Sequence, residues 1–277
     1  LKDSRMAFGY SANEKLNIGI IGCGGKGGYN LSQLKDQNIV ALCDVREEAT
    51  AKSAQEFTSA KVYADFRVML DRQHKEIDAV VVSTPDHTHA AAAIMAMKMG
   101  KHCYCEKPLT HSIYEARMMR EVARKHKVAT QMGNQGNSDE GIRKICEWIW
   151  AGTIGEVTRV DAWTNRPLWP QGLERPSREQ RVPRNLDWDL FIGPAPMRPY
   201  NEIYTPWNWQ GWWDFGTGAF GDMACHILDP VYRALKLGYP EKVRGSSTAF
   251  NTESAPQAET VEFTFPARDN LPRLALP

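Results

Sequence analysis

Short apolar runs alternate with amphipathic stretches over the first half of the chain. Amphipathic stretches at 46–57, 90–99 and 112–126 predict helices between the apolar runs. Strands that alternate with helices indicate βαβ units, so we expect a doubly wound parallel sheet of the Rossmann type, covered on both faces. The predicted strands are 16–22, 39–43, 61–63, 79–83, 102–105 and 128–131.

The pattern changes after the turn-rich segment 133–136, which predicts a domain boundary. The stretch 167–206, rich in Pro, Arg and Trp, predicts a long irregular excursion, and excursions of this length in compact domains are usually functional. We therefore expect a leader or arm at 1–15, a dinucleotide-binding domain at 16–132 and a second α/β domain at 133–277. The elements expected in the second domain are helices at 139–151 and 218–237 and strands at 156–164, 242–249, 260–265 and 271–276.

Composition and charge exclude several classes of protein. The 277 residues are 42% hydrophobic and 24% charged, with a net charge of +1. No basic field points to nucleic acid, and no apolar run approaches the ~18 residues that span a bilayer. The six cysteines lack paired zinc spacing, and Cys103 and Cys105 alternate on one strand, as buried core residues do. The first residue is Leu1, which leaves both an exported protein with a removed signal and a cytoplasmic one open.

A glycine-rich turn follows the first predicted strand. Its glycines match G-x-G-x-x-G: Gly22 permits the tight turn, Gly24 lets the backbone approach a pyrophosphate, and Gly27 lets the next helix pack closely. Asp44 ends the second strand about twenty residues later, where it would accept hydrogen bonds from the adenosine ribose. A carboxylate there repels a 2′-phosphate and favours NAD, whereas Arg46 could pair with that phosphate and leaves NADP open.

The segment after the fourth predicted strand also faces the ligand crevice of such a sheet. We expect Thr84 and Pro85 to contact the cofactor there. His89, or else His87, is expected near the ribose or nicotinamide, and the alternative is that one of them caps the following helix.

Two further segments carry candidate chemistry. The fifth strand ends in Glu106-Lys107-Pro108, and a downstream glycine-rich segment at 216–229 carries Asp222 and His226. Together with the glycine turn, these motifs resemble the glucose–fructose oxidoreductase/inositol dehydrogenase (Gfo/Idh/MocA) family from residue 16 onward. The stretches 164–172 and 211–218 resemble its Bacteroidetes/Planctomycetes-type branch, whose chains often carry an export signal.

The resemblance implies a Rossmann domain joined to an α/β domain with an open, mostly antiparallel sheet. It implies an NAD(P)-dependent oxidoreductase acting on a sugar or polyol, a cis Lys107–Pro108 bond, and a homo-oligomer formed through the C-terminal sheet. Relatives usually continue past the equivalent of Pro277, so we expect the second domain to be truncated at its C-terminus.

Elementary chemistry agrees with catalytic roles for three residues. Hydride transfer from a carbinol carbon requires a base for the hydroxyl proton and a group that stabilises charge on the oxygen. Asp222 and His226, four residues apart on a helix, project from one face, and a histidine titrates near neutrality. Lys107 at a strand end can donate to the substrate oxygen, and Glu106 is expected to help bind the cofactor or position Lys107. A metal held by His226 with Asp222 or Asp229 is the alternative, and we expect none because no further ligand cluster supports it.

Aromatic residues gather in the second half of the chain. Trp163, Arg166, Trp212 and Trp213 are predicted to bind substrate, because sugar C–H faces pack on aromatic rings while guanidinium groups bind hydroxyls. The alternative is that these tryptophans fill the core. Gly133, Asn134 and Gln135 are expected to reach the site from the domain junction.

Three functions therefore stand open. The leading hypothesis is a dehydrogenase that interconverts a secondary alcohol and a ketone. The second is an NAD-dependent glycosidase that works by transient oxidation and elimination, and the third is a non-catalytic protein that binds NAD as a structural or sensing ligand.

Overall fold

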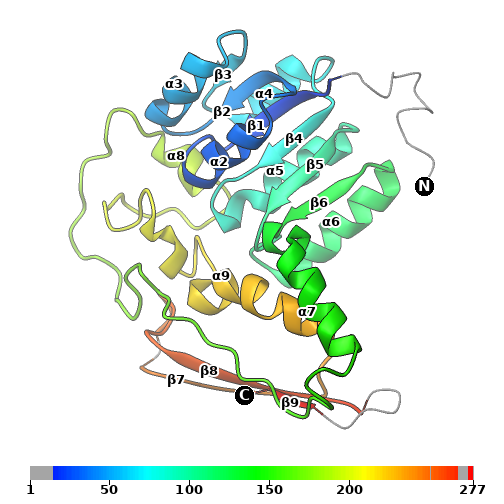
Figure 1. Ribbon diagram of the computed structural model, residues 1–277. Coiled ribbons are helices and arrows are strands. Elements are labelled where there is room, and N and C mark those ends of the chain that lie inside the picture. Colours follow the sequence, from blue (N-terminus) through cyan, green and yellow to red (C-terminus); the bar gives the residue numbers. More distant parts are fainter. Residues whose placement is uncertain (1–14, 250, 268–273, 277) are drawn as a thin grey trace.

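A six-stranded parallel sheet forms the upper layer of the molecule in Figure 1. The computed structural model describes residues 15–249, 251–267 and 274–276, so the predicted arm lies outside the described residues except for Lys15. The strand order β3-β2-β1-β4-β5-β6 is that of a Rossmann fold, as predicted. The strands are β1 (Asn17–Ile21), β2 (Asn38–Cys43), β3 (Lys61–Tyr63), β4 (Ala79–Val82), β5 (His102–Glu106) and β6 (Thr130–Gly133).

Helices cover both faces of this sheet because its strands are apolar on both sides. Val80, Val82 and Cys105 pack in one cluster with residues of α4, α5 and α6, whereas Ile20 and Leu42 pack on the other face. Cys103 and Cys105 are buried core residues, as predicted. The helices are α2 (Gly25–Gln33), α3 (Glu47–Glu56), α4 (Phe66–Gln73), α5 (Asp86–Lys98) and α6 (Ile113–His126).

The second half of the chain combines helices with a small antiparallel sheet of order β7-β8-β9. The predicted helix at 218–237 is two helices, because Pro230 in the first turn of α10 has no N–H to continue the ladder. The predicted boundary near residue 133 stays a prediction. The elements are the 3-10 turns η1 (Gln135–Ser138) and η2 (Asn208–Gly211), helices α7 (Glu140–Trp150), α8 (Trp188–Ile192), α9 (Gly218–Ile227) and α10 (Asp229–Ala234), and strands β7 (Lys242–Ser247), β8 (Glu259–Phe265) and β9 (Leu274–Leu276).

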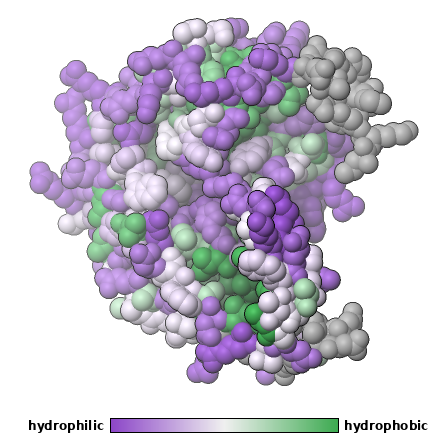
Figure 2. Space-filling view, viewed as in Figure 1, coloured by the Kyte–Doolittle hydropathy of each residue, from purple (hydrophilic) through white to green (hydrophobic). Residues whose placement is uncertain are grey.

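The strand predicted at 156–164 is wrong. This segment forms none of the named strands, and Trp163 is 81% exposed. Its alternating pattern is real, but among the described residues only Arg159 of this segment takes part in a β-bridge, so the segment lacks the continuous ladder of a strand. Figure 2 shows strongly hydrophobic side chains on this lower part of the molecule, and exposed apolar residues there include Phe220 and Val243.

The long excursion is irregular in its backbone but has its own core. In Figure 1 it runs up one side of the molecule to α8, which lies beside the large sheet. Trp188 stacks on Phe191 with ring centroids 5.1 Å apart, and Trp212 meets Tyr204 edge-on at 4.9 Å. We call the buried group formed here the aromatic cluster; it consists of Leu186, Trp188, Phe191, Ile192, Tyr200, Tyr204, Trp212 and Phe215.

Candidate active site

The glycine turn between β1 and α2 has the geometry of a dinucleotide site. Gly22 has φ +87°, and a Cβ atom on it would lie 2.6 Å from the Ser83 carbonyl oxygen. A Cβ atom on Gly27 would lie 1.8 Å from the Gly22 oxygen, so packing requires both glycines. A Cβ atom on Gly24 would meet only Ala49 at 3.6 Å and Asp44 at 3.9 Å. The fold does not require Gly24, which leaves its backbone open to a ligand's approach.

Asp44 braces this turn from the end of β2. Its Oδ2 accepts hydrogen bonds from the backbone N–H groups of Cys23 at 2.8 Å and Gly24 at 3.2 Å. Burial raises the pKa of Asp44, and the backbone donors, with the Arg46 N–H first among them, oppose that rise. The Arg46 guanidinium faces Glu48 at 3.2 Å, so it is already paired with a carboxylate.

The segment after β4 supplies a further polar group. The Thr84 hydroxyl oxygen is buried without a hydrogen-bond partner among the described residues. Such an orphan is expected where a ligand or water completes the site. With the open Gly24 backbone, this is the structural fit for NAD.

His89 does not face the crevice. It is 1% exposed, and its ring nitrogens lie 2.8 Å from the carbonyl oxygens of Pro108 and Thr84. This corrects the expectation that His89 contacts the cofactor: its ring instead joins the loop after β4 to the loop after β5. Neither it nor His87 caps α5, whose N-cap residue is Pro85 without a side-chain cap.

Glu106 is buried beneath the glycine turn and faces α2. Its Oε1 accepts a hydrogen bond from the Asn30 amide at 2.8 Å and lies 3.9 Å from the Lys26 Nζ. A Cβ atom on Gly133 would lie 2.6 Å from this carboxyl group, so β6 needs glycine there. These contacts tie the end of β5 to the helix whose N-terminus would hold the pyrophosphate.

Lys107 and Asp222 meet across the two halves of the chain. The Lys107 Nζ donates to the Asp222 Oδ1 at 2.5 Å and to its backbone oxygen at 3.1 Å. The Gln210 amide also donates to that Oδ1 at 3.2 Å, while the Gln210 Oε1 is buried without a partner among the described residues. The peptide bond between Lys107 and Pro108 is cis, as predicted.

His226 lies on the same face of α9, and a second amide sets its tautomer. The Asn134 Nδ2 donates to the Cys225 carbonyl oxygen at 2.7 Å, which turns the Asn134 Oδ1 toward His226. That oxygen lies 2.9 Å from the His226 Nδ1, so this nitrogen must carry the proton and Nε2 the lone pair. Burial first, and then the charge of Lys107, lower the pKa of His226. The ring is therefore a neutral base at neutral pH.

Contacts from the first turn of α5 hold α9 in place. The Thr217 hydroxyl donates to the buried carboxyl group of Asp86 at 3.0 Å, and burial raises the pKa of Asp86 to about 7. The His87 ring nitrogens lie 3.2 Å from the Phe215 oxygen and 2.9 Å from the Phe191 oxygen. These contacts fix the start of α9 against the sheet that carries Lys107.

The predicted substrate residues do not gather at this site. Trp212 is fully buried in the aromatic cluster, so its predicted role in substrate binding is wrong and the core alternative holds for it. Trp163 and Arg166 line a cavity of about 400 Å³ on the other face of α9, beside Met223. Trp213 is half-buried next to Gly218, and a substrate role for it stays a prediction.

Sequence reasoning missed Gln210, Asp86 and Lys26 and gave Asn134 no specific role. Each is a polar residue that no motif specifies, Lys26 being a variable position of the glycine motif, and its role depends on a partner far along the chain. A weak signal existed for Asn134, which directly follows β6, and for Asp86, which begins α5 after the loop that follows β4; both lie at the ligand edge of the sheet. Within the described residues, no group of three His, Cys, Asp or Glu side chains is placed to hold a metal ion, and no helix there is long and apolar enough to cross a membrane.

The strand order, the glycine turn and the Lys107–Asp222 pair define a two-part oxidoreductase fold with an NAD-binding Rossmann domain. Sequence profiles agree. The NAD-binding Rossmann-fold domain of the oxidoreductase family GFO_IDH_MocA matches residues 16–134, and the C-terminal alpha/beta domain of that family matches residues 143–265. The chain belongs to the Gfo/Idh/MocA oxidoreductase family, as the sequence motifs predicted.

Individual relatives fit this assignment. The myo-inositol 2-dehydrogenase of Thermotoga maritima is 31% identical over 190 residues, which are 67% of this chain and 54% of that protein. A glycosyl hydrolase family 109 protein of Solibacter usitatus is 28% identical over 180 residues, 60% of this chain and 40% of that protein. The WlbA dehydrogenase of Bordetella pertussis, solved with NADH and UDP-GlcNAcA, shares the fold: the TM-score is 0.68 at 21% identity, covering 96% of this chain and 67% of that one. The chain spans about half the length of the curated relatives it matches.

Proposed function

We propose that this chain transfers a hydride between NAD and a secondary alcohol of a sugar or polyol. The observation that carries the proposal is the contact of the Lys107 Nζ with the Asp222 Oδ1 at 2.5 Å, with His226 one turn further along α9. This group lies at the end of β5, where ligands of such sheets bind. The similarity to a myo-inositol 2-dehydrogenase supports a polyol or sugar as the substrate class.

Different side chains would stabilise the substrate oxygen, accept its proton and bind a neighbouring hydroxyl group. Bound NAD supplies the hydride acceptor at its nicotinamide. Lys107 donates a hydrogen bond to the substrate oxygen and stabilises the charge that develops there, while Asp222 holds the ammonium group in position. His226 takes the hydroxyl proton at Nε2, because Asn134 keeps Nδ1 protonated. The unpartnered Gln210 Oε1 offers an acceptor for a neighbouring substrate hydroxyl.

Five groups of this chain would hold the cofactor. The open backbone at Gly24 and the N-terminus of α2 suit the pyrophosphate, and Asp44 suits the ribose hydroxyls. The Thr84 hydroxyl is free to bond, and Pro85 beside it forms the same edge.

A substrate panel tests the proposal. Free polyols, free sugars and glycosides would each be incubated with NAD or NADP, with reduced-nicotinamide absorbance and product chromatography as the readouts. We expect steady NADH release with at least one polyol or sugar. NADH binding without any turnover, together with unchanged biological activity of Lys107→Ala, would instead indicate a non-catalytic NAD-binding protein.

A second candidate is an NAD-dependent glycosidase, which the similarity to a glycosyl hydrolase family 109 protein favours. In that reaction, oxidation at one carbon acidifies the neighbouring C–H, elimination breaks the glycosidic bond and releases the aglycone, water adds to the resulting double bond, and the hydride returns to the ketone. The same panel separates the two activities, because glycoside cleavage without net NADH supports the glycosidase.

The small sheet is the surface where we propose that copies of this chain associate. All six residues of β7 are exposed, and an uncovered strand edge can pair with another chain. Light scattering at several protein concentrations would test this, and a monomer at every concentration would contradict it.

A further inference from the structure

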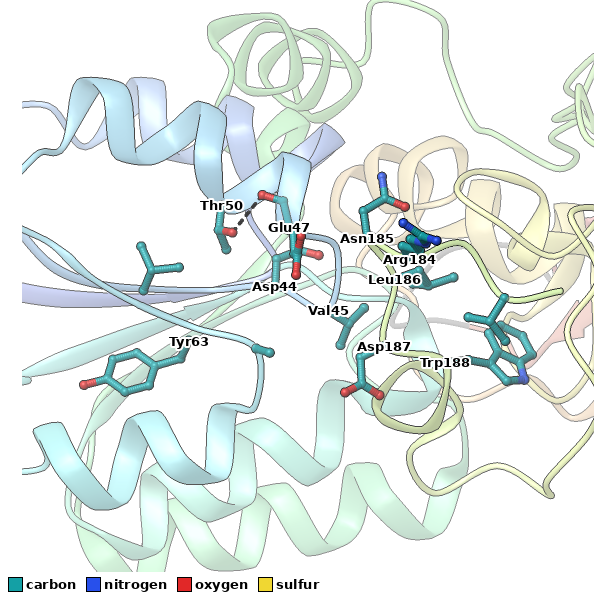
Figure 3. A pocket seen from close by; sticks show the side chains of 13 residues that line it. Asp44, Val45, Glu47, Thr50, Tyr63, Arg184, Asn185, Leu186, Asp187 and Trp188 are labelled. Atoms are coloured by element: carbon teal, nitrogen blue, oxygen red, sulfur yellow. Dashed lines mark hydrogen bonds between the residues drawn. The ribbon is translucent and has the colours of Figure 1, made fainter.

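A cavity of about 510 Å³ lies where β2 and β3 end, and the second half of the chain closes it. One wall consists of residues of the Rossmann domain, including Asp44, Glu47 and Tyr63. The opposite wall is segment 182–188, which we call the strap. Figure 3 shows Asn185 and Asp187 of the strap across from Tyr63. The volume lies within the range of about 300–1,000 Å³ that is usual for ligand pockets.

Backbone pairing fixes the strap onto the sheet edge. The Glu47 N–H donates to the Asn185 oxygen at 3.0 Å, and the Asp187 N–H donates to the Val45 oxygen at 2.9 Å. Arg46 and Leu186 form an antiparallel bridge between these bonds. The strap is therefore paired along its backbone with the residues that directly follow Asp44.

Side-chain contacts on the side away from the cavity also hold the strap in place. The Trp188 indole N–H donates to the Arg198 oxygen at 2.8 Å, and its ring stacks on Phe191. Leu186 is buried in the same aromatic cluster, against which Val45 packs. The Asn185 amide also donates to the Glu48 carboxylate on α3. A rigid core thus fixes this wall of the cavity.

The cavity is placed for the adenosine half of a dinucleotide. When a pyrophosphate binds at the N-terminus of α2, the adenosine ribose lies at the end of β2. Asp44, which lines the cavity, is bonded to the Gly24 N–H of that same turn. We propose that the strap is the outer wall of the adenosine subsite, and that Asp187 joins Asp44 in selecting NAD over NADP.

Charge supports the selectivity. Three carboxylate residues line the cavity, Asp44, Glu47 and Asp187, against one guanidinium residue, Arg184. The Arg46 guanidinium, the expected partner of a 2′-phosphate, is paired with Glu48. The lining as a whole therefore holds more carboxylates than guanidinium groups, which disfavours a 2′-phosphate, and on the strap Asp187 opposes the attraction that Arg184 would offer.

Hydrogen exchange on the unaltered protein tests the location without requiring activity. ADP-ribose carries the adenosine half, whereas nicotinamide mononucleotide does not. We expect ADP-ribose to slow amide exchange in peptides covering 44–47 and 182–188, and nicotinamide mononucleotide to leave 182–188 unchanged. ADP-ribose protection at 44–47 without any at 182–188 would overturn the wall assignment.

A matched pair of variants tests the selectivity. Asp187→Asn removes a charge but keeps an oxygen that can accept from the Leu190 N–H, and Asp189→Asn removes a neighbouring charge that does not line the cavity. By calorimetry, we expect Asp187→Asn to raise the ratio of NADP to NAD affinity about three- to tenfold and Asp189→Asn to change it less than about twofold. Equal ratios for the two variants would overturn the role of Asp187. Both measurements stand apart from the substrate proposal, because neither requires turnover.

Discussion

The two faces of α9 meet the rest of the molecule in different ways. On one face, each polar group has a specific partner: Asp222 contacts Lys107 and Gln210, and His226 contacts Asn134. The other face borders a cavity of about 400 Å³ with apolar residues such as Met223. The difference indicates that one face is built for proton chemistry, since networks with satisfied partners fix orientation and tautomer. The substitutions below test this assignment.

Removing the ammonium group should have the largest effect. We expect Lys107→Met to lower kcat by about 10²–10⁴-fold on the substrate found by the panel, because the developing oxygen charge loses its donor. NAD affinity, measured by calorimetry, should change little. The exposed Lys98→Met serves as the control and should retain full activity. Equal activity of Lys107→Met and Lys98→Met would show that this face of α9 does not carry out the reaction.

The next effect concerns the tautomer of His226. The base is active when neutral, so activity is present above its pKa and lost as pH falls through it, and burial places this limb below about 6.5. We expect Asn134→Asp to shift the acid limb of kcat/KM upward by about one pH unit, because a carboxylate facing Nδ1 stabilises the imidazolium. Asn134→Leu should lower kcat without that shift.

Nitrogen NMR checks the same contact without turnover. Nδ1 should carry the proton in the unaltered protein. An Nε2-protonated ring would contradict the orientation argued from Asn134 and Cys225.

His87, whose ring contacts help to position α9, should make the free energy of unfolding depend on pH. Burial lowers the pKa of His87 to about 4, from about 6.5 when unfolded. Above about pH 6.5, His87 is neutral in both the folded and the unfolded state. As pH falls from about 6.5 to about 4, only the unfolded state binds the proton. The free energy of unfolding therefore falls by up to a few kcal/mol over this window. His89, whose pKa burial also lowers, adds in the same direction.

Urea unfolding at several pH values measures this loss. His87→Gln should flatten the pH dependence over this window, although it also costs stability at pH 8 because the contacts to Phe215 and Phe191 change. The control is the exposed His74→Gln, which should leave the slope unchanged. A slope that His87→Gln does not alter would mean that His87 is charged in the folded protein.

Local patterns in the sequence predicted the first half of the molecule well. Apolar runs and glycine requirements act over a few residues, so the six strands and the turn at Gly22 were accessible. The tie between Lys107 and Asp222 spans 115 residues and rested on family resemblance together with the i, i+4 spacing on α9. Roles that depend on partners far apart, such as those of Asn134, Gln210 and the strap, could not be predicted. Trp212 shows the same limit, since composition alone does not tell a core tryptophan from a pocket tryptophan.

The smallest effect should come from the apolar face of α9. Trp163 is 81% exposed and lines the cavity on that side together with Arg166. If substrate binds between Lys107 and His226, Trp163→Ala should change KM less than about twofold, since an exposed ring loses little buried area on truncation. The matched variant on the polar face is Gln210→Ala, which should raise KM by roughly tenfold because it removes a buried partner of Asp222. A larger rise in KM for Trp163→Ala than for Gln210→Ala would show that the sugar binds on the side of α9 away from Lys107. The apolar face of α9, and not the polar one, would then be the substrate-binding face.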